Sequence, residues 1–209
     1  MPQITTAQWV MFYPPSDACK LTLDPNTAHN NLTLSEGNRV VERCPNVKHS
    51  YPDHPDRFNS VGQVLCREAV SKHCYWEVEW SGSYVHIAVS YKGLSRKGGA
   101  NDCRLGNNKK SWSLWCNSSR YTFIHDNKGM SLPHKPTSTS RIGVYVDHKT
   151  GTLSFYSVSD TMILLHKVHT TFTEPLYPGF WLNSKGSKIR LCQWQHTSRI
   201  KTFMSSLNG

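Results

Sequence analysis

Hydrophobic and polar residues alternate with a period of two along much of the chain. In one stretch the large apolar residues Trp76, Val78 and Trp80 alternate with Glu77 and Glu79. Such alternation is typical of β-strands that bury one face, because successive side chains point to opposite sides of a sheet. We therefore expect the apolar stripe to face a core and the two glutamates to face solvent.

A second alternating segment follows directly, with Val85, Ile87, Val89 and Tyr91 on one face and His86, Ala88 and Ser90 on the other. Further along, an apolar stripe at Ile142, Val144 and Val146 is followed by the turn-forming stretch 147–151 and by Leu153 and Phe155 on one face. This order predicts a β-hairpin. Gly151 would supply the positive φ that its turn needs, and Asp147 would hydrogen-bond the turn backbone.

Shorter runs predict further strands, separated by turn residues at fairly regular intervals. They are Lys20–Leu23, Asn31–Leu34, Arg39–Glu42, Gln63–Cys66, Ser111–Cys116, Tyr121–His125, Ile163–Lys167 and Lys188–Cys192. Many short strands without strand-helix alternation favour an all-β fold of two packed antiparallel sheets. We expect helix only in the tail, where Ile200, Phe203, Met204 and Leu207 follow a helical spacing, and in a turn or two of the first 13 residues.

Long polar connections separate some of these strands, at positions 49–59, 94–110, 127–140 and 183–187. Binding residues in compact β domains are often on such loops. We therefore look for functional residues there and on the strand ends beside them.

Length and composition fit one globular domain outside a membrane. The chain has 209 residues, of which 37% are hydrophobic, with seven Trp, nine Tyr and seven Phe, and this aromatic content excludes a disordered chain. The longest apolar run, 9–13, is far too short to span a bilayer. Residues 1–18 contain no Lys or Arg and meet Pro14-Pro15, so we expect no secretory signal and a cytoplasmic location.

No motif in the sequence predicts catalysis, a metal or a cofactor. The seven cysteines include no C-x-x-C pair, and we expect them to be reduced and structural. Neither His73-Cys74 nor His166-x-x-His169 supplies a zinc ligand set. There is no G-x-S-x-G elbow and no phosphate-binding glycine loop, so we predict no catalytic residue and no enzyme.

Positive charge is concentrated in the later part of the chain. The net charge is +10, yet residues 1–70 hold six Lys/Arg against seven Asp/Glu, while residues 71–140 hold ten against four. Within 92–110 there are six cations and one anion, Asp102. Such a loop could steer an acidic partner or bind nucleic acid. Nucleic acid is the less favoured reading, because no aromatic residue is interleaved with these cations.

Several separate motifs, in order, resemble one known family. They are Leu23-Asp24-Pro25-Asn26-Thr27-Ala28, Tyr75-Trp76-Glu77-Val78-Glu79, Ser111-Trp112-Ser113-Leu114, Gly143-Val144-Tyr145-Val146-Asp147, Gly151-Thr152-Leu153-Ser154-Phe155-Tyr156 and Pro175-Leu176-Tyr177-Pro178-Gly179-Phe180. Over about Cys19 to Cys192 the sequence resembles the PRY-SPRY (B30.2) domain, and most closely the domains that end fish NOD-like receptors, fish tripartite-motif proteins and the stonustoxin group.

The resemblance implies a bent two-layer β-sandwich that binds a protein partner of unknown identity through variable loops. We expect an N-terminal extension at 1–18, a PRY segment at 19–66, an SPRY segment at 67–193 and a C-terminal tail at 194–209. The implied parent is an innate-immune receptor or a ubiquitin-ligase type protein. The alternatives are the C-terminal domain of a secreted pore-forming toxin subunit, a basic nucleic-acid-binding sandwich, and a glycan reader.

Candidate contact residues follow from the resemblance and from the alternation at 111–117. If Trp112, Leu114 and Cys116 face the core, then Ser113, Trp115 and Asn117 face outward. In antibody-binding relatives two tryptophans occupy the positions that resemble Trp115 and Asn117, so this chain keeps half of that pattern. The predicted partner-binding set, taken from loops and this outward edge, is Tyr51, Asp53, Arg96, Arg104, Lys110, Trp115, Asn117, Trp181 and Asn183.

Overall fold

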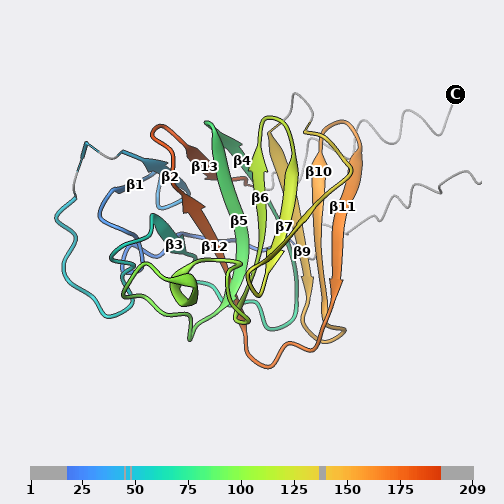
Figure 1. The fold of residues 1–209 in the computed structure, drawn as a ribbon, viewed down its shortest axis with the longest axis horizontal. Coiled ribbons are helices and arrows are strands. Elements are labelled where there is room, and N and C mark those ends of the chain that lie inside the picture. The colour runs from blue at the N-terminus through green and yellow to red at the C-terminus, as the bar shows by residue number, and fades with distance from the viewer. Residues whose placement is uncertain (1–17, 45, 48, 137–139, 194–209) are drawn as a thin grey trace, which may run out of the picture.

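A computed structural model describes residues 18–44, 46–47, 49–136 and 140–193. Its strands form two antiparallel sheets that pack face to face, which confirms the all-β sandwich (Figure 1). The described part of the chain contains no α-helix, and its one regular helical piece is a 3-10 turn, η2 (Asn101–Cys103). The helices expected in the tail and in the first 13 residues lie outside the described residues.

The larger sheet has seven strands in the order β1-β2-β13-β4-β9-β10-β11. Their bounds are β1 (Leu32–Ser35), β2 (Val40–Arg43), β4 (His73–Ser81), β9 (Arg141–Asp147), β10 (Thr152–Val158), β11 (Met162–His169) and β13 (Lys188–Leu191). The predicted hairpin is β9 and β10, in which Val144 lies opposite Phe155. At its turn Gly151 has φ of 69° and Asp147 accepts backbone hydrogen bonds from Lys149 and Thr150.

The smaller sheet has six strands in the order β3-β12-β5-β6-β7-β8. Their bounds are β3 (Gln63–Leu65), β5 (Tyr84–Tyr91), β6 (Ser111–Asn117), β7 (Tyr121–His125), β8 (Lys128–Ser131) and β12 (Leu176–Leu182). Because β1 and β2 join one sheet and β3 joins the other, the first third of the chain is built into both layers.

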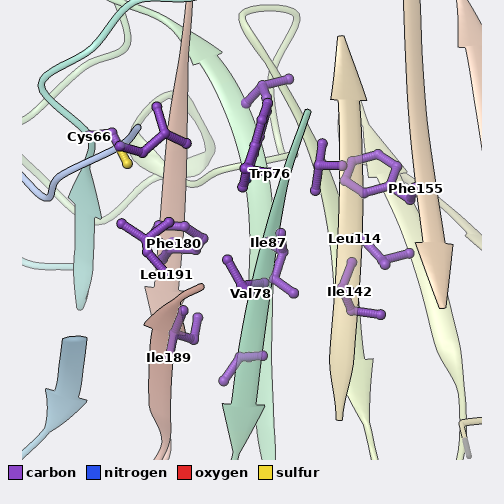
Figure 2. Close-up of a cluster of buried hydrophobic side chains, with 14 of the residues drawn as sticks. Cys66, Trp76, Val78, Ile87, Leu114, Ile142, Phe155, Phe180, Ile189 and Leu191 are labelled. Carbon is purple, nitrogen blue, oxygen red and sulfur yellow. The ribbon is translucent and has the colours of Figure 1, made fainter. Parts of the chain in front are cut away.

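The core lies between the sheets and contains the predicted apolar stripes. Trp76 and Val78 of the large sheet pack in the same cluster as Ile87 and Leu114 of the small one (Figure 2). Ile87, Leu114 and Val78 have no exposed surface, and Trp76 is 2% exposed. Burial of so many large side chains is the main source of stability in such a sandwich.

Two strand predictions were wrong. Lys20–Leu23 makes only an isolated bridge, between Leu23 and Cys66, although Leu21 and Leu23 are buried. The connection expected at 127–140 contains a strand, β8, which pairs with β7 through a turn where Asp126 and Asn127 have positive φ. Strand β12 was not predicted from the sequence. It contains Pro178, which cannot donate to a ladder, and β3 pairs with β12 only beyond this residue, from Gly179.

Two predictions about side chains were also wrong. The structure joins Cys19 and Cys74 in a disulfide, whereas we expected reduced thiols; the described cysteines other than this pair are free. Glu77 is 4% exposed rather than turned to solvent. It accepts a hydrogen bond of 2.9 Å from the Tyr75 hydroxyl and lies 3.3 Å from Arg141 Nη1, and these polar contacts offset the cost of burying its carboxylate.

Candidate functional site

The connection between β5 and β6 packs against the outer face of the six-stranded sheet. Leu94 and Leu105 pack on Leu65 and Ala88 in a second small core. The Gln63 amide holds this connection in place, because it donates to the Cys103 carbonyl at 2.7 Å and accepts from Leu105 N at 2.8 Å. The connection gathers at one end of the sheet, where β5 ends and β6 begins (Figure 1).

Close packing under this connection explains why position 106 is a glycine. Gly106 has φ of 89°, and a Cβ there would come within 2.8 Å of Ser113 Cβ and 3.0 Å of the Ile124 carbonyl oxygen. Ser113 is therefore fully buried although it points away from the main core. The expectation that Ser113 faces outward is right about the direction of its side chain and wrong about its exposure.

The part of this face where β5 begins and β6 ends carries four aromatic rings. We call Tyr84, His86, Trp115 and Trp181 the aromatic patch, and the part of the sheet beside it the Tyr84 end. The strand register places His86 between Trp181 on one side and Trp115 on the other. Two strand spacings separate the tryptophans at their backbones, which is about 10 Å.

Ring contacts hold the aromatic patch together. His86 stacks on Trp181 with centroids 4.3 Å apart, and Trp115 lies 6.4 Å from His86 and 6.1 Å from Tyr84, edge-on to the latter. Tyr84, Trp115 and Trp181 are each partly exposed, whereas His86 is 6% exposed beneath them. Rings held at such separations present a large apolar area at little cost in side-chain entropy.

Burial keeps the imidazole of His86 uncharged. Loss of solvent around the ring lowers the pKa of His86 to about 3, since nothing compensates a positive charge there. Its Nδ1 lies 3.2 Å from the Ser113 hydroxyl. The aromatic patch is therefore neutral at its centre throughout the physiological pH range.

Polar residues around the patch fix its border. Asn183 Nδ2 donates to the Tyr84 hydroxyl at 3.2 Å. Asn117 Oδ1 accepts from Ser119 N, Ser119 Oγ and Arg120 N at 2.9 to 3.0 Å, so its side chain shapes the turn between β6 and β7. That turn places the Arg120 guanidinium 5.2 Å from the centre of the Trp115 ring, a cation–π contact.

Four predicted contact residues, Trp115, Asn117, Trp181 and Asn183, thus lie together at the Tyr84 end. Lys110 does not join them: it precedes β6 and stands five residues before Trp115, about 17 Å along the strand. Arg104 belongs to the same distant connection, where its backbone carbonyl accepts a hydrogen bond from Asn108 Nδ2.

Arg96, another residue of the predicted partner-binding set, is only 8% exposed. Its guanidinium lies 4.8 Å from the Phe58 ring centre and donates to the carbonyls of Leu94 and Lys92. The Arg96 charge was predicted to contact a partner, but its hydrogen bonds are made within the connection between β5 and β6. A sequence does not reveal this, since an arginine in a polar loop can turn either way.

Tyr51 and Asp53 form a separate group on the 49–59 segment. The Tyr51 hydroxyl donates to the Leu32 carbonyl at 3.0 Å, and its ring lies 5.0 Å from the Arg57 guanidinium. Asp53 is exposed and 4.0 Å from Lys97 Nζ. These contacts order the segment, and none of them reaches the aromatic patch.

The structure adds Tyr84 and His86 to the predicted set. Both lie on the face of β5 opposite its core stripe, so the alternation gave their direction. What it lacked was the register of three neighbouring strands, which brings them beside Trp115 and Trp181.

The described part of the structure contains neither a metal-ligand cluster nor a membrane-spanning helix. Within it, no three His, Cys, Asp or Glu residues are grouped as metal ligands would be. No helix among these residues has the length and apolar character needed to cross a bilayer.

Comparison with known proteins identifies the class of domain. The model for the SPRY-associated domain, PRY, matches residues 21–70, and the model for the SPRY domain matches residues 73–194. The chain therefore belongs to the PRY-SPRY family, whose domains are binding modules rather than a catalytic fold.

Individual relatives come from two kinds of protein. The chain is 43% identical over 173 residues to stonustoxin subunit beta of Synanceia horrida, covering 82% of this chain and 24% of that one. It is 40% identical over 176 residues to tripartite motif-containing protein 16 of Mus musculus, covering 83% and 31%. The chain thus spans 24% and 31% of the length of these two relatives.

A solved structure supports the fold. The structure of the TRIM65 PSpry domain superimposes with a TM-score of 0.76 at 29% sequence identity, covering 86% of this chain and 92% of that one. The two-sheet architecture is therefore the one expected of the family.

Proposed function

We propose that this chain is a protein-recognition module whose aromatic patch holds the partner. The observation that carries the proposal is the grouping of the partly exposed rings of Tyr84, Trp115 and Trp181 at the Tyr84 end of the sheet. Trp181 also packs against the small core under the 94–110 connection. Partly exposed aromatic rings next to a guanidinium are the residue types that dominate binding energy in protein interfaces. Family membership supports the same function, because SPRY domains commonly bind proteins.

For the parent we propose an innate-immune receptor or a ubiquitin-ligase type protein acting in the cytoplasm. The identity to a tripartite motif-containing protein supports this choice. The identity to stonustoxin subunit beta supports a second candidate, a domain of a larger toxin subunit. The transcript upstream of Met1 separates the two, because a zinc-binding ligase or receptor region and a toxin region would differ in sequence.

The binding proposal is tested with Trp115→Ala in an affinity measurement against a partner captured with the wild-type chain. Because Trp115 is partly exposed, its loss leaves the main core intact. We expect affinity to fall about 30-fold or more, corresponding to the roughly 2 kcal/mol of an interface hot spot. Lys109→Ala, an exposed change at the other end of β6, is the matched control and should bind as the wild type does.

Unchanged affinity of a folded Trp115→Ala variant would remove the patch from the binding site. Folding of the variant is checked by its thermal transition, which should stay within a few degrees of the wild type.

A further inference from the structure

Acidic residues are absent from all six strands of the sheet that carries the aromatic patch. Acidic residues within strands are confined to the seven-stranded sheet, at Glu42, Glu77, Glu79 and Asp147. The strands of the sheet that carries the patch therefore contribute no negative charge, and the charge around the patch is set by the connections beside it.

Three connections at the Tyr84 end of this sheet are basic. Residues 82–83, 118–120 and 183–187 contain no Asp or Glu, and they contribute the exposed cations Arg120 and Lys185. The neighbouring sheet has acidic residues toward this end: Glu42, which lies opposite Lys188, Glu79, which pairs with Arg141, and Asp160 in the turn between β10 and β11. None of them belongs to the sheet that carries the patch.

Arg120 places its charge directly at the predicted anchor. Its guanidinium lies over the Trp115 ring at 5.2 Å, and no carboxylate pairs with it among the described residues. A partner side chain that packs against Trp115 would therefore bring its neighbours within reach of the guanidinium.

Arg43 adds a second guanidinium on the opposite border. Gly186 N donates to the Arg43 carbonyl at 3.0 Å, which places Arg43 beside the turn that contains Lys185. Its Nη1 comes 3.4 Å from His29 Nδ1, and none of the described carboxylates pairs with it. Gly62 makes room for it, since a Cβ there would meet Arg43 Nη1 at 2.6 Å and the Leu182 carbonyl at 2.5 Å.

We infer that the aromatic patch selects an acidic segment of a protein, in which an apolar side chain is flanked by carboxylates. The apolar side chain packs on Trp115 and Tyr84, while Arg120 on one border and Lys185 with Arg43 on the other pair with the carboxylates. This inference rests on the proposed function and adds the chemistry of the partner to it. Unpaired cations that border an apolar contact favour an oppositely charged partner and repel basic ones.

The test uses a random dodecapeptide library displayed on phage, with the whole chain as bait. Peptides that bind the wild type and are lost with Trp115→Ala are sequenced and synthesised, and their affinities are measured by fluorescence anisotropy. We expect this Trp115-dependent pool to be enriched in Asp and Glu beside an aromatic or aliphatic residue. Raising the salt from low to high ionic strength should weaken these peptides about 10-fold.

Two matched double variants separate local from overall charge. Arg120→Ser with Lys185→Ser should weaken the acidic peptides about 10-fold, at a few-fold per removed charge. Lys92→Ser with Lys109→Ser removes the same charge from exposed positions at the other end of the sheet and should leave their affinity unchanged.

The outcomes distinguish the inference from the proposed function. A Trp115-dependent pool that is neutral or basic overturns the acidic partner and leaves protein binding intact. Equal weakening by both double variants also overturns it, because the effect would then follow net charge alone. If no peptide depends on Trp115, the proposed function itself fails. A 20-nucleotide single-stranded DNA that displaces the peptides from the patch would overturn the peptide as partner.

Discussion

Replacing His86 by Gln should make the free energy of unfolding depend less on pH below about 6.5. The His86 ring is uncharged in the folded state because burial lowers its pKa to about 3, against an ordinary value near 6.5. Between these two values the unfolded chain binds a proton that the folded chain does not. The free energy of unfolding therefore falls as the pH drops below about 6.5. Above that pH His86 is neutral in both states, and the folded chain keeps its full stability.

The size of this effect follows from the pKa difference. Each pH unit between the two pKa values lowers the free energy of unfolding by about 1.4 kcal/mol. The total loss of stability caused by His86 is therefore on the order of 5 kcal/mol at pH 3. Gln keeps a polar group that can reach the Ser113 hydroxyl but does not titrate. Burial also lowers the pKa of His29 and His166, so part of the slope should remain in the variant.

The assay is urea unfolding from pH 7.5 to 4, which gives the free energy of unfolding at each pH for wild type, His86→Gln and the exposed control His134→Gln. The difference between wild type and His86→Gln should narrow steadily below pH 6.5, while His134→Gln should run parallel to the wild type. Parallel curves for all three proteins would refute the account of a buried, neutral His86, because the histidine would then titrate alike in both states.

Two further predictions concern the disulfide and a turn glycine. Cys19→Ser opens the bond to Cys74, which spans 55 residues, and should lower the free energy of unfolding by about 4 kcal/mol in the chain-entropy estimate; urea unfolding with and without a reductant checks this, and a reductant should leave the variant unaffected. Gly151→Ala should destabilise the chain by more than about 2 kcal/mol, because φ is 69° and the new Cβ would stand 1.8 Å from the Thr170 carbonyl oxygen. Gly37→Ala, at φ of 66° but with nothing within 4 Å, should cost only about 1 kcal/mol, and equal thermal shifts for the two variants would contradict the clash.

The fold could be predicted from sequence because the core stripes obey a simple period. Trp76, Val78 and Trp80 are buried as the alternation requires, and so are Val85, Ile87 and Val89. The prediction failed where the pattern has a competing signal. Pro178 and Gly179 interrupt the strand pattern of β12, and β8 has four exposed residues with a glycine and no apolar alternation, which is typical of a loop.

The candidate site was predicted only in part, for a different physical reason. Alternation gives the direction of a side chain but not whether another segment covers it. Ser113 and Trp115 point the same way, yet Gly106 packs over the first and leaves the second open. Likewise Arg96 was chosen for its charge, whereas its burial depends on a contact with Phe58, 38 residues earlier in the chain.

Partner binding at the aromatic patch is tested by the exposure of the patch side chains in the presence of a captured partner. Hydroxyl-radical footprinting reports oxidation of individual residues, and Met130 on β8, 47% exposed, serves as the internal reference. We predict that partner binding protects Tyr84, Trp115 and Trp181 while Met130 oxidises at its free rate. Unchanged oxidation of the three rings in the complex would contradict the assignment of the aromatic patch as the binding site.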